Sequence, residues 1–410
     1  MNIPLSKPDI GEREIQTVTE VLRSERLSLG PKQSEFEAAF AEYAGTRYAI
    51  CTNSGTSALH LCVRALGIGH QDEVITSAFS FVASTNCCLY EGAIPVLVDI
   101  DPFTLNLDPR QVRNFLKQSC VVDSGTGCVI NKQTGRTVKA ILPVHVFGLA
   151  CEMDAILELA HHYHLAVLED ACEALGAEYH GRRVGTFGDA AVFAFYPNKQ
   201  ITSGEGGMIV TNNAEIAALC RSMRNQGRTE DSSWLHHVRL GYNYRLSELH
   251  CALGLAQLQR LSELLAARDR VASEYERALA GIPQLVLPRR ESGGLVRSWF
   301  VYVVQLDYPS PRTIRDRVIA KLRENGIQSQ AYFPALHRQP HIAAEAEIPS
   351  GSLPRTETAS DRCIALPFFP TETHAEVHYV SQTLARILKE EIGASQVTGQ
   401  HFQAAAGAIL

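Results

Sequence analysis

Two residues with reactive side chains, an aspartate and a lysine, follow apolar runs near the middle of the sequence. Asp170 ends the run Ala166–Glu169, and Lys199 lies in a short polar loop between the run Ala190–Ala194 and a Gly-rich segment. A lysine in a loop is normally a solvated charge, but beside a buried strand its amine can be partly desolvated and become nucleophilic. An acid and an amine at one sheet edge could hold an aldehyde as a Schiff base. Asp170 could equally cap the helical turn that follows it.

Residues 48–66 predict a site for an anion. The short apolar run Tyr48–Cys51 leads into the polar loop Thr52–Thr56, and a helix is expected from Ser57 to about Leu66. A strand, a Gly-containing loop and a helix leave unpaired backbone N–H groups at the helix N-terminus, where a phosphate can bind. A simple capped turn explains the same pattern, so both interpretations stay open at this point.

The elements that would position these residues alternate along the chain. Apolar runs of strand length recur, and helical patterns such as Asp154–His164 separate several of them. This alternation predicts an α/β fold with a largely parallel sheet that is covered on both faces. Ligands bind such sheets at the carboxyl ends of the strands, which is where Asp170 and Lys199 lie. The expected strands are 48–51, 73–76, 94–98, 140–144, 166–169, 190–194 and 208–211.

The length and composition of the chain favour two domains. Its 410 residues exceed the size at which a single hydrophobic core usually stops growing. A long helical pattern covers Ser247–Leu279, and a Pro- and Gly-containing stretch follows it. We therefore expect a large domain over residues 1–260 and a smaller C-terminal α+β domain over residues 261–393. The Ala-, Gly- and Gln-rich tail at 394–410 has a composition that favours disorder.

Charge and cysteine usage narrow the class of protein. The net charge of −6 gives no general attraction to nucleic acid or to anionic membranes. No apolar run is long enough to span a membrane, and the N-terminus lacks the apolar core of a signal peptide, so we expect a cytoplasmic protein. Eleven cysteines without a Cys-x-x-Cys pair favour reduced thiols. We predict no metal site, because the histidine cluster at 161–164 lacks a second set of ligands.

Five motifs together resemble the DegT/DnrJ/EryC1/StrS family, in the family's order, between about Ile10 and Ile387. The resemblance implies a sugar aminotransferase that depends on pyridoxal 5'-phosphate (PLP). It also implies the aspartate aminotransferase fold (fold type I), with three layers, a mostly parallel seven-stranded sheet and a smaller C-terminal domain. The motifs are Asn-Ser-Gly-Thr-Ser-Ala-Leu at 53–59, Glu-Asp-Ala-Cys-Glu-Ala at 169–174, Gly-Thr-Phe-Gly-Asp at 185–189, Tyr-Pro-Asn-Lys-Gln-Ile-Thr-Ser-Gly-Glu-Gly-Gly at 196–207 and Gly-Tyr-Asn-Tyr-Arg at 241–245.

The resemblance assigns the cofactor-binding roles. Lys199 would form the Schiff base with PLP and later move the proton between the two reacting carbons. Asp170 would pair with the pyridine nitrogen and keep the ring protonated. Phe81 stands where the family places an aromatic side chain on the cofactor ring, although a core position in a strand is the alternative. Gly55 and Thr56 would supply backbone donors and a hydroxyl to the phosphate.

Further residues match the family at positions around the cofactor and the substrate. Glu173 would support the cofactor. Asn243 resembles a residue that the neighbouring subunit contributes to the phosphate site, which implies a homodimer with shared active sites, although an Asn in a turn is the alternative. Tyr332 and His337 lie in a segment that resembles the family's region near the sugar, and Arg245 could meet a carboxylate or a phosphate of the substrate. His337 could also be a surface residue.

One position departs from the family pattern. Many relatives carry a phosphate-binding serine five residues before the lysine, and this chain has Ala194 there. Either Ser203 or Thr202 compensates, or the phosphate has one contact fewer. The lysine is retained, which argues against the relatives that remove oxygen from sugars and carry histidine in its place.

These observations predict the transfer of an amino group, from L-glutamate, to the keto group of a nucleotide-linked 4-keto-6-deoxy sugar. A 3-keto sugar, a keto-cyclitol or an aminobenzoate precursor is the alternative acceptor. A regulatory protein that keeps the fold without turnover is an alternative of another class. The joint presence of Lys199, Asp170 and the Gly-Thr turn at 55–56 argues against that class.

Overall fold

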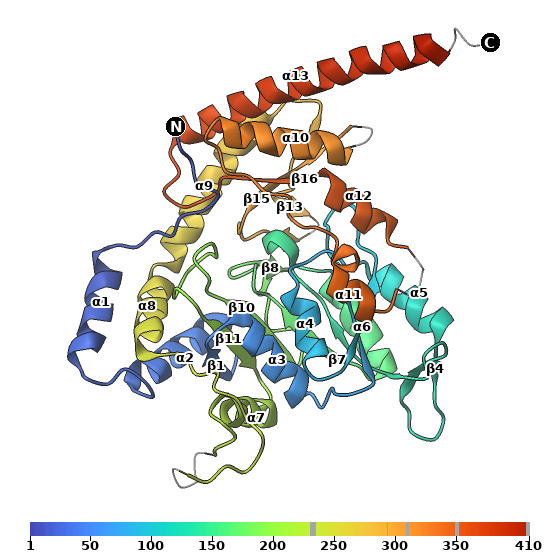
Figure 1. Ribbon diagram of the computed structural model, residues 1–410. Helices are drawn as coiled ribbons and strands as arrows, with labels where there is room; N and C mark the ends of the chain where they lie inside the picture. The colour runs from blue at the N-terminus through green and yellow to red at the C-terminus, as the bar shows by residue number, and fades with distance from the viewer. Residues whose placement is uncertain (230–234, 293, 309–310, 349–351, 407–410) are drawn as a thin grey trace.

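The computed structural model describes residues 1–229, 235–292, 294–308, 311–348 and 352–406. At its centre lies a mixed sheet with helices on both faces, in the lower part of Figure 1. The strand order is β1 (Tyr48–Thr52), β11 (Gly207–Thr211), β10 (Ala190–Ala194), β7 (Ala166–Asp170), β6 (Thr137–Leu142), β2 (Asp72–Ser77) and β3 (Ile94–Val98).

Four of the six pairings along this sheet are parallel, and β11 is antiparallel to both of its neighbours. The prediction of a mostly parallel sheet of seven strands is confirmed for this path. A hairpin of β4 (Cys120–Val122) and β5 (Val129–Asn131) adds two further strands at β6. This hairpin accounts for the polar, Gly-containing stretch between Asp123 and Arg136, whose residues form its turn and its link to β6.

The two faces of the sheet build two hydrophobic cores. Because successive strand residues point to opposite faces, neighbours in one strand enter different cores. In β7, Val167 packs into one core and Leu168 into the other, and in β10 Phe193 and Val192 divide in the same way. The covering helices are α2 (Pro31–Ala44), α3 (Gly55–Ala65), α4 (Ala83–Leu89), α5 (Pro109–Ser119), α6 (Met153–Tyr163), α7 (Ala214–Arg224) and α8 (Glu248–Gln259), with α1 (Glu12–Arg23) packed outside α8.

A separate core lies in the C-terminal part, in the upper half of Figure 1. Apolar residues of α9 (Leu261–Leu279), such as Val271 and Leu279, pack there against the sheet of β12 (Leu285–Val286), β15 (Tyr302–Leu306) and β16 (Cys363–Leu366). The helices of this part are α10 (Pro311–Glu324), α11 (Pro340–Glu345), α12 (Pro354–Arg362) and α13 (His374–Ala406).

A small sheet joins the two parts of the chain. It contains β8 (Glu178–Tyr179) and β9 (Arg182–Arg183) together with β13 (Glu291–Ser292) and β14 (Leu295–Val296). Helix α13 continues through 394–406, and residues 407–410 of the predicted tail lie outside the described residues. The two domains and the disordered tail stay predictions.

Candidate active site

The residues predicted to do chemistry converge on one cavity with a volume of about 430 Å³. It lies at the carboxyl ends of the parallel strands, where ligands of such sheets bind. Predicted residues that line it are Gly55, Thr56, Phe81, Asp170, Glu173, Lys199 and Tyr332. The structure therefore brings together both halves of the expected acid and amine pair, and the individual roles stay predictions.

Asp170 ends β7 with its carboxylate held from two directions. Ser84 Oγ donates to Oδ2 at 2.7 Å, and the backbone N–H of Cys172 donates to Oδ1 at 3.1 Å. The side chain is buried, yet it lines the cavity. Because a carboxylate can accept about four hydrogen bonds, Asp170 keeps acceptor capacity for a group inside the cavity.

The preceding residue, Glu169, points to the opposite face of the sheet and holds the strand end in place. Its carboxylate accepts the backbone N–H groups of Gly185, Phe187 and Gly188 at 2.7 to 2.8 Å and lies 3.1 Å from His145 Nε2. Burial alone would raise the pKa of Glu169, but His145 and these amides hold it below its ordinary value. A carboxylate with this many partners is structural, and it positions Asp170 beside it.

The Lys199 amine lies between an acid and an aromatic ring. Nζ is 3.9 Å from Glu173 Oε1 and 4.0 Å from the centre of the Phe300 ring. Burial raises the pKa of Glu173 to about 7, although Lys199 and the N–H of Phe147 act to lower it. A carboxyl group that changes its charge near neutral pH therefore lies next to the predicted nucleophile.

The N-terminus of α3 also lines the cavity. Ser54 caps the helix, because its hydroxyl accepts the N–H of Ser57 at 3.0 Å. Gly55 and Thr56 lie in the first turn, where backbone N–H groups have no acceptor within the helix. A Cβ atom on Gly55 would lie only 2.8 Å from the Cβ of Ala194, so only glycine fits without displacement. This part of the cavity suits an anion.

Two aromatic side chains contribute to the cavity from different elements. Phe81 follows β2, and its side chain is 60% exposed, so it is not the core strand residue of the alternative interpretation. Tyr332 is half-buried and stacks on Phe333 with ring centres 5.0 Å apart. An aromatic ring left exposed at a cavity wall is available to stack on a flat ligand.

Five predicted residues are absent from the lining of this cavity. Ser203 is buried and donates its hydroxyl to the carbonyl of Glu205 at 2.7 Å, and Thr202 donates to the carbonyl of Phe195 at 3.0 Å. Neither hydroxyl compensates for Ala194 in this arrangement. The remaining three lie elsewhere: Asn243 on the surface, Arg245 bonded to Asn225 at 3.1 Å, and His337 next to Glu357 at 3.1 Å.

Several lining residues escaped the sequence prediction. Ser84 lies in the first turn of α4, shortly after β2, and a hydroxyl that follows a strand end is the signal that could have identified it. Phe300 comes from the C-terminal part, and nothing in the local sequence connects it with Lys199. The other unpredicted lining residues include Ser54, Val144, Cys172, Tyr196, Asn198 and Glu205.

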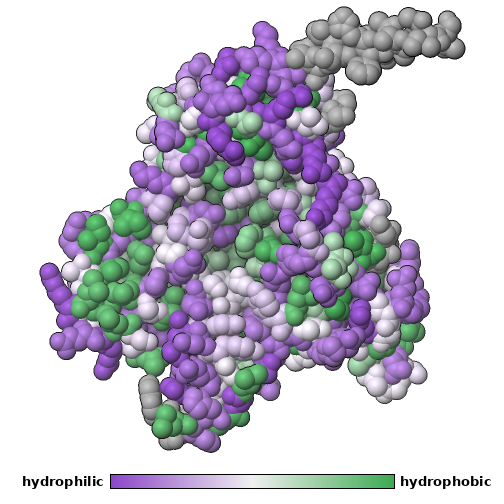
Figure 2. All heavy atoms as spheres, in the orientation of Figure 1, coloured by the Kyte–Doolittle hydropathy of each residue, from purple (hydrophilic) through white to green (hydrophobic). Residues whose placement is uncertain are grey.

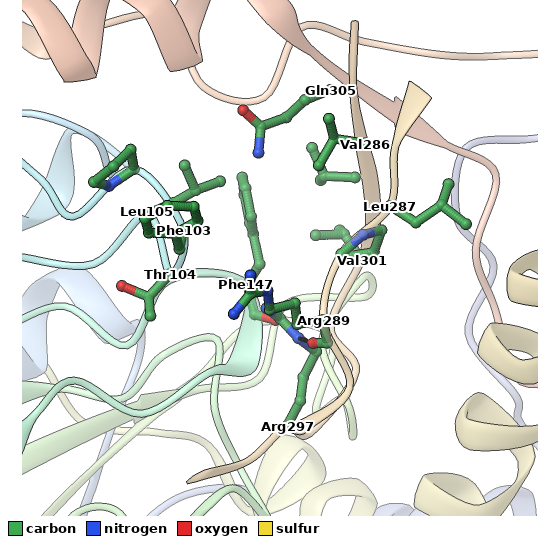
Figure 3. Close-up of a pocket in the computed structure, with 13 residues that line it drawn as sticks. Phe103, Thr104, Leu105, Phe147, Val286, Leu287, Arg289, Arg297, Val301 and Gln305 are labelled. Carbon is green, nitrogen blue, oxygen red and sulfur yellow. Dashed lines mark hydrogen bonds between the residues drawn. The ribbon is translucent and has the colours of Figure 1, made fainter. Parts of the chain in front are cut away.

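A second cavity, of about 170 Å³, lies where loop 102–105 faces the C-terminal sheet (Figure 3). Its cationic groups are Arg289 and Arg297, and none of the residues that line it carries a carboxylate, a thiol or a lysine amine. Phe147 lies among these residues and also donates its N–H to Glu173 at 2.9 Å. The two cavities are therefore neighbours, but only the first contains an acid and a nucleophile.

Two other kinds of site, a metal centre and a membrane span, are not found in the described part of the chain. Within it, no three His, Cys, Asp or Glu side chains gather so that they could hold a metal ion. None of its helices combines the length and apolar character that crossing a membrane requires.

Known proteins show the same combination of fold and motifs. Residues 8–385 match the model of the DegT/DnrJ/EryC1/StrS aminotransferase family. A GDP-perosamine synthase from Caulobacter vibrioides is 38% identical, covering 94% of this chain and 98% of the relative. The crystal structure of S. venezuelae DesV, in complex with a ketimine intermediate, superposes with a TM-score of 0.82 at 33% identity, covering 94% of this chain and 98% of that one. 3-Amino-5-hydroxybenzoic acid synthase gives a TM-score of 0.84 at 27% identity, covering 95% of this chain and 99% of that one.

Proposed function

Because the chain belongs to the DegT/DnrJ/EryC1/StrS family of PLP-dependent aminotransferases, we propose that it aminates a nucleotide-linked 4-keto-6-deoxy sugar with L-glutamate as the amino donor. The observation that carries the proposal is the position of Lys199 and Asp170 in one cavity with the N-terminus of α3. The similarity to a GDP-perosamine synthase supports a nucleotide-linked sugar as the acceptor.

The residues of the cavity fit PLP in charge and shape. The first turn of α3 offers N–H groups to the phosphate, and the absence of a Cβ on Gly55 leaves room beside Ala194. Asp170 offers a buried carboxylate to the pyridine nitrogen, and Phe81 offers an aromatic face to the ring. Bound PLP supplies an aldehyde that condenses with amines and a ring that accepts electrons.

We propose roles for the protein groups that their positions support. Lys199 Nζ would be the nucleophile toward the aldehyde, and once released it would be the base that moves a proton between the amino donor and the cofactor. Asp170, held by Ser84, keeps the ring nitrogen protonated. Glu173, 3.9 Å from the amine, can hold or accept a proton from it near neutral pH.

We further propose a homodimer in which Asn243 reaches the phosphate site of the partner. Asn243 is exposed, in a segment tied to the N-terminal loop of α3, where Asn53 N–H donates to the carbonyl of Tyr244 at 2.9 Å. Apolar side chains gather on the surface over α1 in Figure 2, where Ile15 is 53% and Leu22 58% exposed. An exposed apolar patch of this kind suits the interface with a second copy. Arg245, Tyr332 and His337 remain the proposed contacts to substrate.

We assign the protein to the cytoplasm on the state of its thiols. All eleven cysteines are free, and nine of them are buried. Free thiols on this scale are typical of reducing compartments.

Replacement of Lys199 tests the central claim. We expect the purified protein with PLP to show a visible Schiff-base band that added L-glutamate bleaches, and to aminate a nucleotide-linked 4-keto sugar. Lys199→Ala should lose the band and about 1,000-fold or more in turnover, because the nucleophile and proton carrier is removed. Normal turnover by this variant would rule out the mechanism.

Mixing two inactive variants tests the shared site. Lys199→Ala and Asn243→Ala homodimers should each have low activity, since one lacks the amine and the other a phosphate ligand. After the subunits exchange, a mixed dimer contains one site with both native residues, so part of the activity should return. No recovery in dimers shown to be mixed would contradict a shared site.

A second acceptor class is supported by the likeness to 3-amino-5-hydroxybenzoic acid synthase. A panel of nucleotide-linked 3-keto and 4-keto sugars, a keto-cyclitol and an aminobenzoate precursor would separate the candidates. Schiff-base formation without turnover of any of these acceptors, and without bleaching by L-glutamate, would favour a regulatory protein.

A further inference from the structure

Arg268 is a fully buried cation that contacts the segment carrying Lys199. It lies on α9, is 1% exposed, and donates Nη2 to the carbonyl of Lys199 at 2.6 Å. Nη2 also approaches the carbonyl of Asn198 at 3.5 Å, and Nη1 donates to the carbonyl of Phe300 at 3.1 Å. We call residues 196–203, which contain Lys199, the lysine turn. The guanidinium therefore connects the lysine turn with the segment that contains Phe300.

No carboxylate of the described residues forms an ion pair with Arg268, which distinguishes it from Arg224. The Arg224 guanidinium pairs with Glu37 and donates to the carbonyl of Cys51 at 2.7 Å. Burial alone would lower the pKa of Arg224, but Glu37 and Cys51 raise it above its ordinary value. For Arg268, burial lowers the pKa to about 10. The partners of the Arg268 charge are backbone carbonyls and the face of the Phe368 ring, whose centre lies 5.7 Å from Cζ. A buried charge without a carboxylate partner is costly for stability. The position of Arg268 next to the lysine turn indicates that it serves the site rather than the stability of the fold.

The two segments that Arg268 joins meet at the Lys199 amine. One carries the backbone of Lys199, and the other carries Phe300, whose ring centre lies 4.0 Å from Nζ. Arg268 also marks the point where α9 passes between cores, because Leu264 packs into the core of the large sheet and Val271 into the C-terminal core. The Arg268 side chain thus bonds to the backbone of both Lys199 and Phe300. It extends from a helix that packs into both cores.

We propose that Arg268 is a positioning residue that fixes the backbone of Lys199 and the Phe300 ring, and so directs the amine into the cavity. The inference rests on the proposed role of Lys199 as the Schiff-base lysine. Without the guanidinium, the carbonyls of Lys199 and Phe300 would lose their shared donor, and the turn could adopt other positions. A displacement of a reacting group by about 1 Å is enough to slow a reaction about 100-fold.

Two substitutions and one control test this proposal. Arg268→Met keeps the length of the side chain and removes both the donors and the buried charge, so the fold should tolerate it. Arg268→Lys keeps the charge but offers fewer donors in a different geometry. The control is Tyr275→Phe, two turns further along α9, which removes a buried hydrogen bond of 2.8 Å to Glu372 far from the lysine turn.

Two measurements should separate positioning from general destabilisation. Hydrogen exchange without PLP should become faster in residues 196–203 of Arg268→Met but not in β11. After PLP is added, the Schiff base at Lys199, trapped with borohydride and located by peptide mass, should form about 10- to 100-fold more slowly. Arg268→Lys should be intermediate, and Tyr275→Phe should match the native protein in both measurements.

The proposal is overturned if both Arg268 variants match Tyr275→Phe in exchange and in the rate of Schiff-base formation. If Arg268→Met does not fold, Arg268→Lys decides the question by the same two measurements. A native protein that forms no Schiff base at Lys199 would instead refute the proposed function. The exchange of residues 196–203 would still report whether Arg268 holds the turn.

Discussion

Two parts of the lining of the main cavity are built differently. We call Asp170, Glu173 and Lys199 the amine end, and the first turn of α3 with Ala194 the helix end. At the amine end, Asp170 is held by Ser84, and Glu173 lies next to Lys199, so every charged group has a nearby partner from the same chain. At the helix end, the first turn of α3 offers backbone N–H groups, while Ala194 contributes only a methyl group. The amine end is rich in side-chain chemistry, and the helix end depends on the backbone.

This difference shows which contacts to a ligand a single chain provides without a partner subunit. The amine end needs side chains that can hold and exchange protons, and hydrogen bonds from the same chain hold the carboxylates of Asp170 and Glu173 in place. The helix end needs only positive potential and hydrogen-bond donors, which a helix N-terminus already provides. A second subunit can therefore complete the helix end without disturbing the amine end. Removing groups from each end should produce effects of very different size.

The largest effect in this comparison is expected from Asp170→Asn. The amide cannot keep a pyridine nitrogen protonated, so turnover should fall by about 100-fold or more, as when one preorganised electrostatic partner is lost. Ser84→Ala removes only the hydrogen bond that holds Asp170, and it should reduce turnover by no more than about 10-fold. Steady-state kinetics with saturating PLP measures both. Equal effects of the two variants would show that Ser84, not the charge of Asp170, determines this end of the site.

The amine end could be predicted from the sequence because its parts are local. Asp170 and Lys199 follow strand-length apolar runs. The observed β10 ends where its run ends, and β7 extends one residue further, to Asp170. In a parallel sheet, such ends meet at one edge, so the pattern alone brings the two residues together. The contact of Phe300 with Lys199 depends on how the C-terminal part packs, and no periodicity in the sequence reports that.

The start of α2 also depends on a tertiary contact that the local sequence does not reveal. The sequence predicts a helix from Ser34 with a capping box to Glu37, but the helix begins at Pro31. The carboxylate of Glu248, more than 200 residues away, accepts the N–H groups of Lys32 and Gln33 at 2.7 and 3.1 Å. A cap supplied by tertiary structure leaves no local signal, so this boundary prediction was wrong.

The long helix predicted over Ser247–Leu279 is also interrupted. Helix α8 ends at Gln259 and α9 begins at Leu261, with Arg260 between them. The Arg260 guanidinium lies 2.9 Å from Asp9 and 3.0 Å from Glu14, residues near the start of the chain. Because neither Gly nor Pro marks the break, the sequence pattern reads as continuous.

An intermediate effect, one that depends on pH, is expected from Glu173→Gln. Burial raises the pKa of Glu173 to about 7, above the value of an unfolded chain, so the folded protein binds the proton more tightly. Folding is therefore penalised as the carboxyl ionises, and the penalty grows from about pH 4.5 and is complete above about pH 7. In PLP-free protein, the free energy of unfolding of Glu173→Gln minus that of the native protein should increase across this range.

Urea unfolding at pH 5, 6, 7 and 8 measures that difference. The control is Glu169→Gln, which removes another buried carboxyl, in β7 before the turn that carries Glu173. The pKa of Glu169 lies below its ordinary value of about 4.5, so its ionised form stabilises the fold, and this stabilisation is lost only as the pH falls below that value. From pH 5 to pH 8, the free energy of unfolding of Glu169→Gln minus that of the native protein should therefore be negative and nearly independent of pH. A pH-independent difference for Glu173→Gln would show that its carboxyl does not titrate near neutral pH, and that the amine end lacks the proton acceptor described above.

The smallest effect should come from adding a group to the helix end. Ala194→Ser places a hydroxyl beside the first turn of α3, where the methyl group of Ala194 now lines the cavity. A typical hydrogen bond contributes about 0.5–1.5 kcal/mol net, so PLP should bind about 2- to 10-fold more tightly if the hydroxyl reaches the phosphate. Ala194→Cys is the control, because it has nearly the same size and only a weak donor. Spectroscopic titration of PLP-free protein compares the two. Equal affinities would show that the backbone of α3 already satisfies the phosphate, and that this end gains nothing from a side chain.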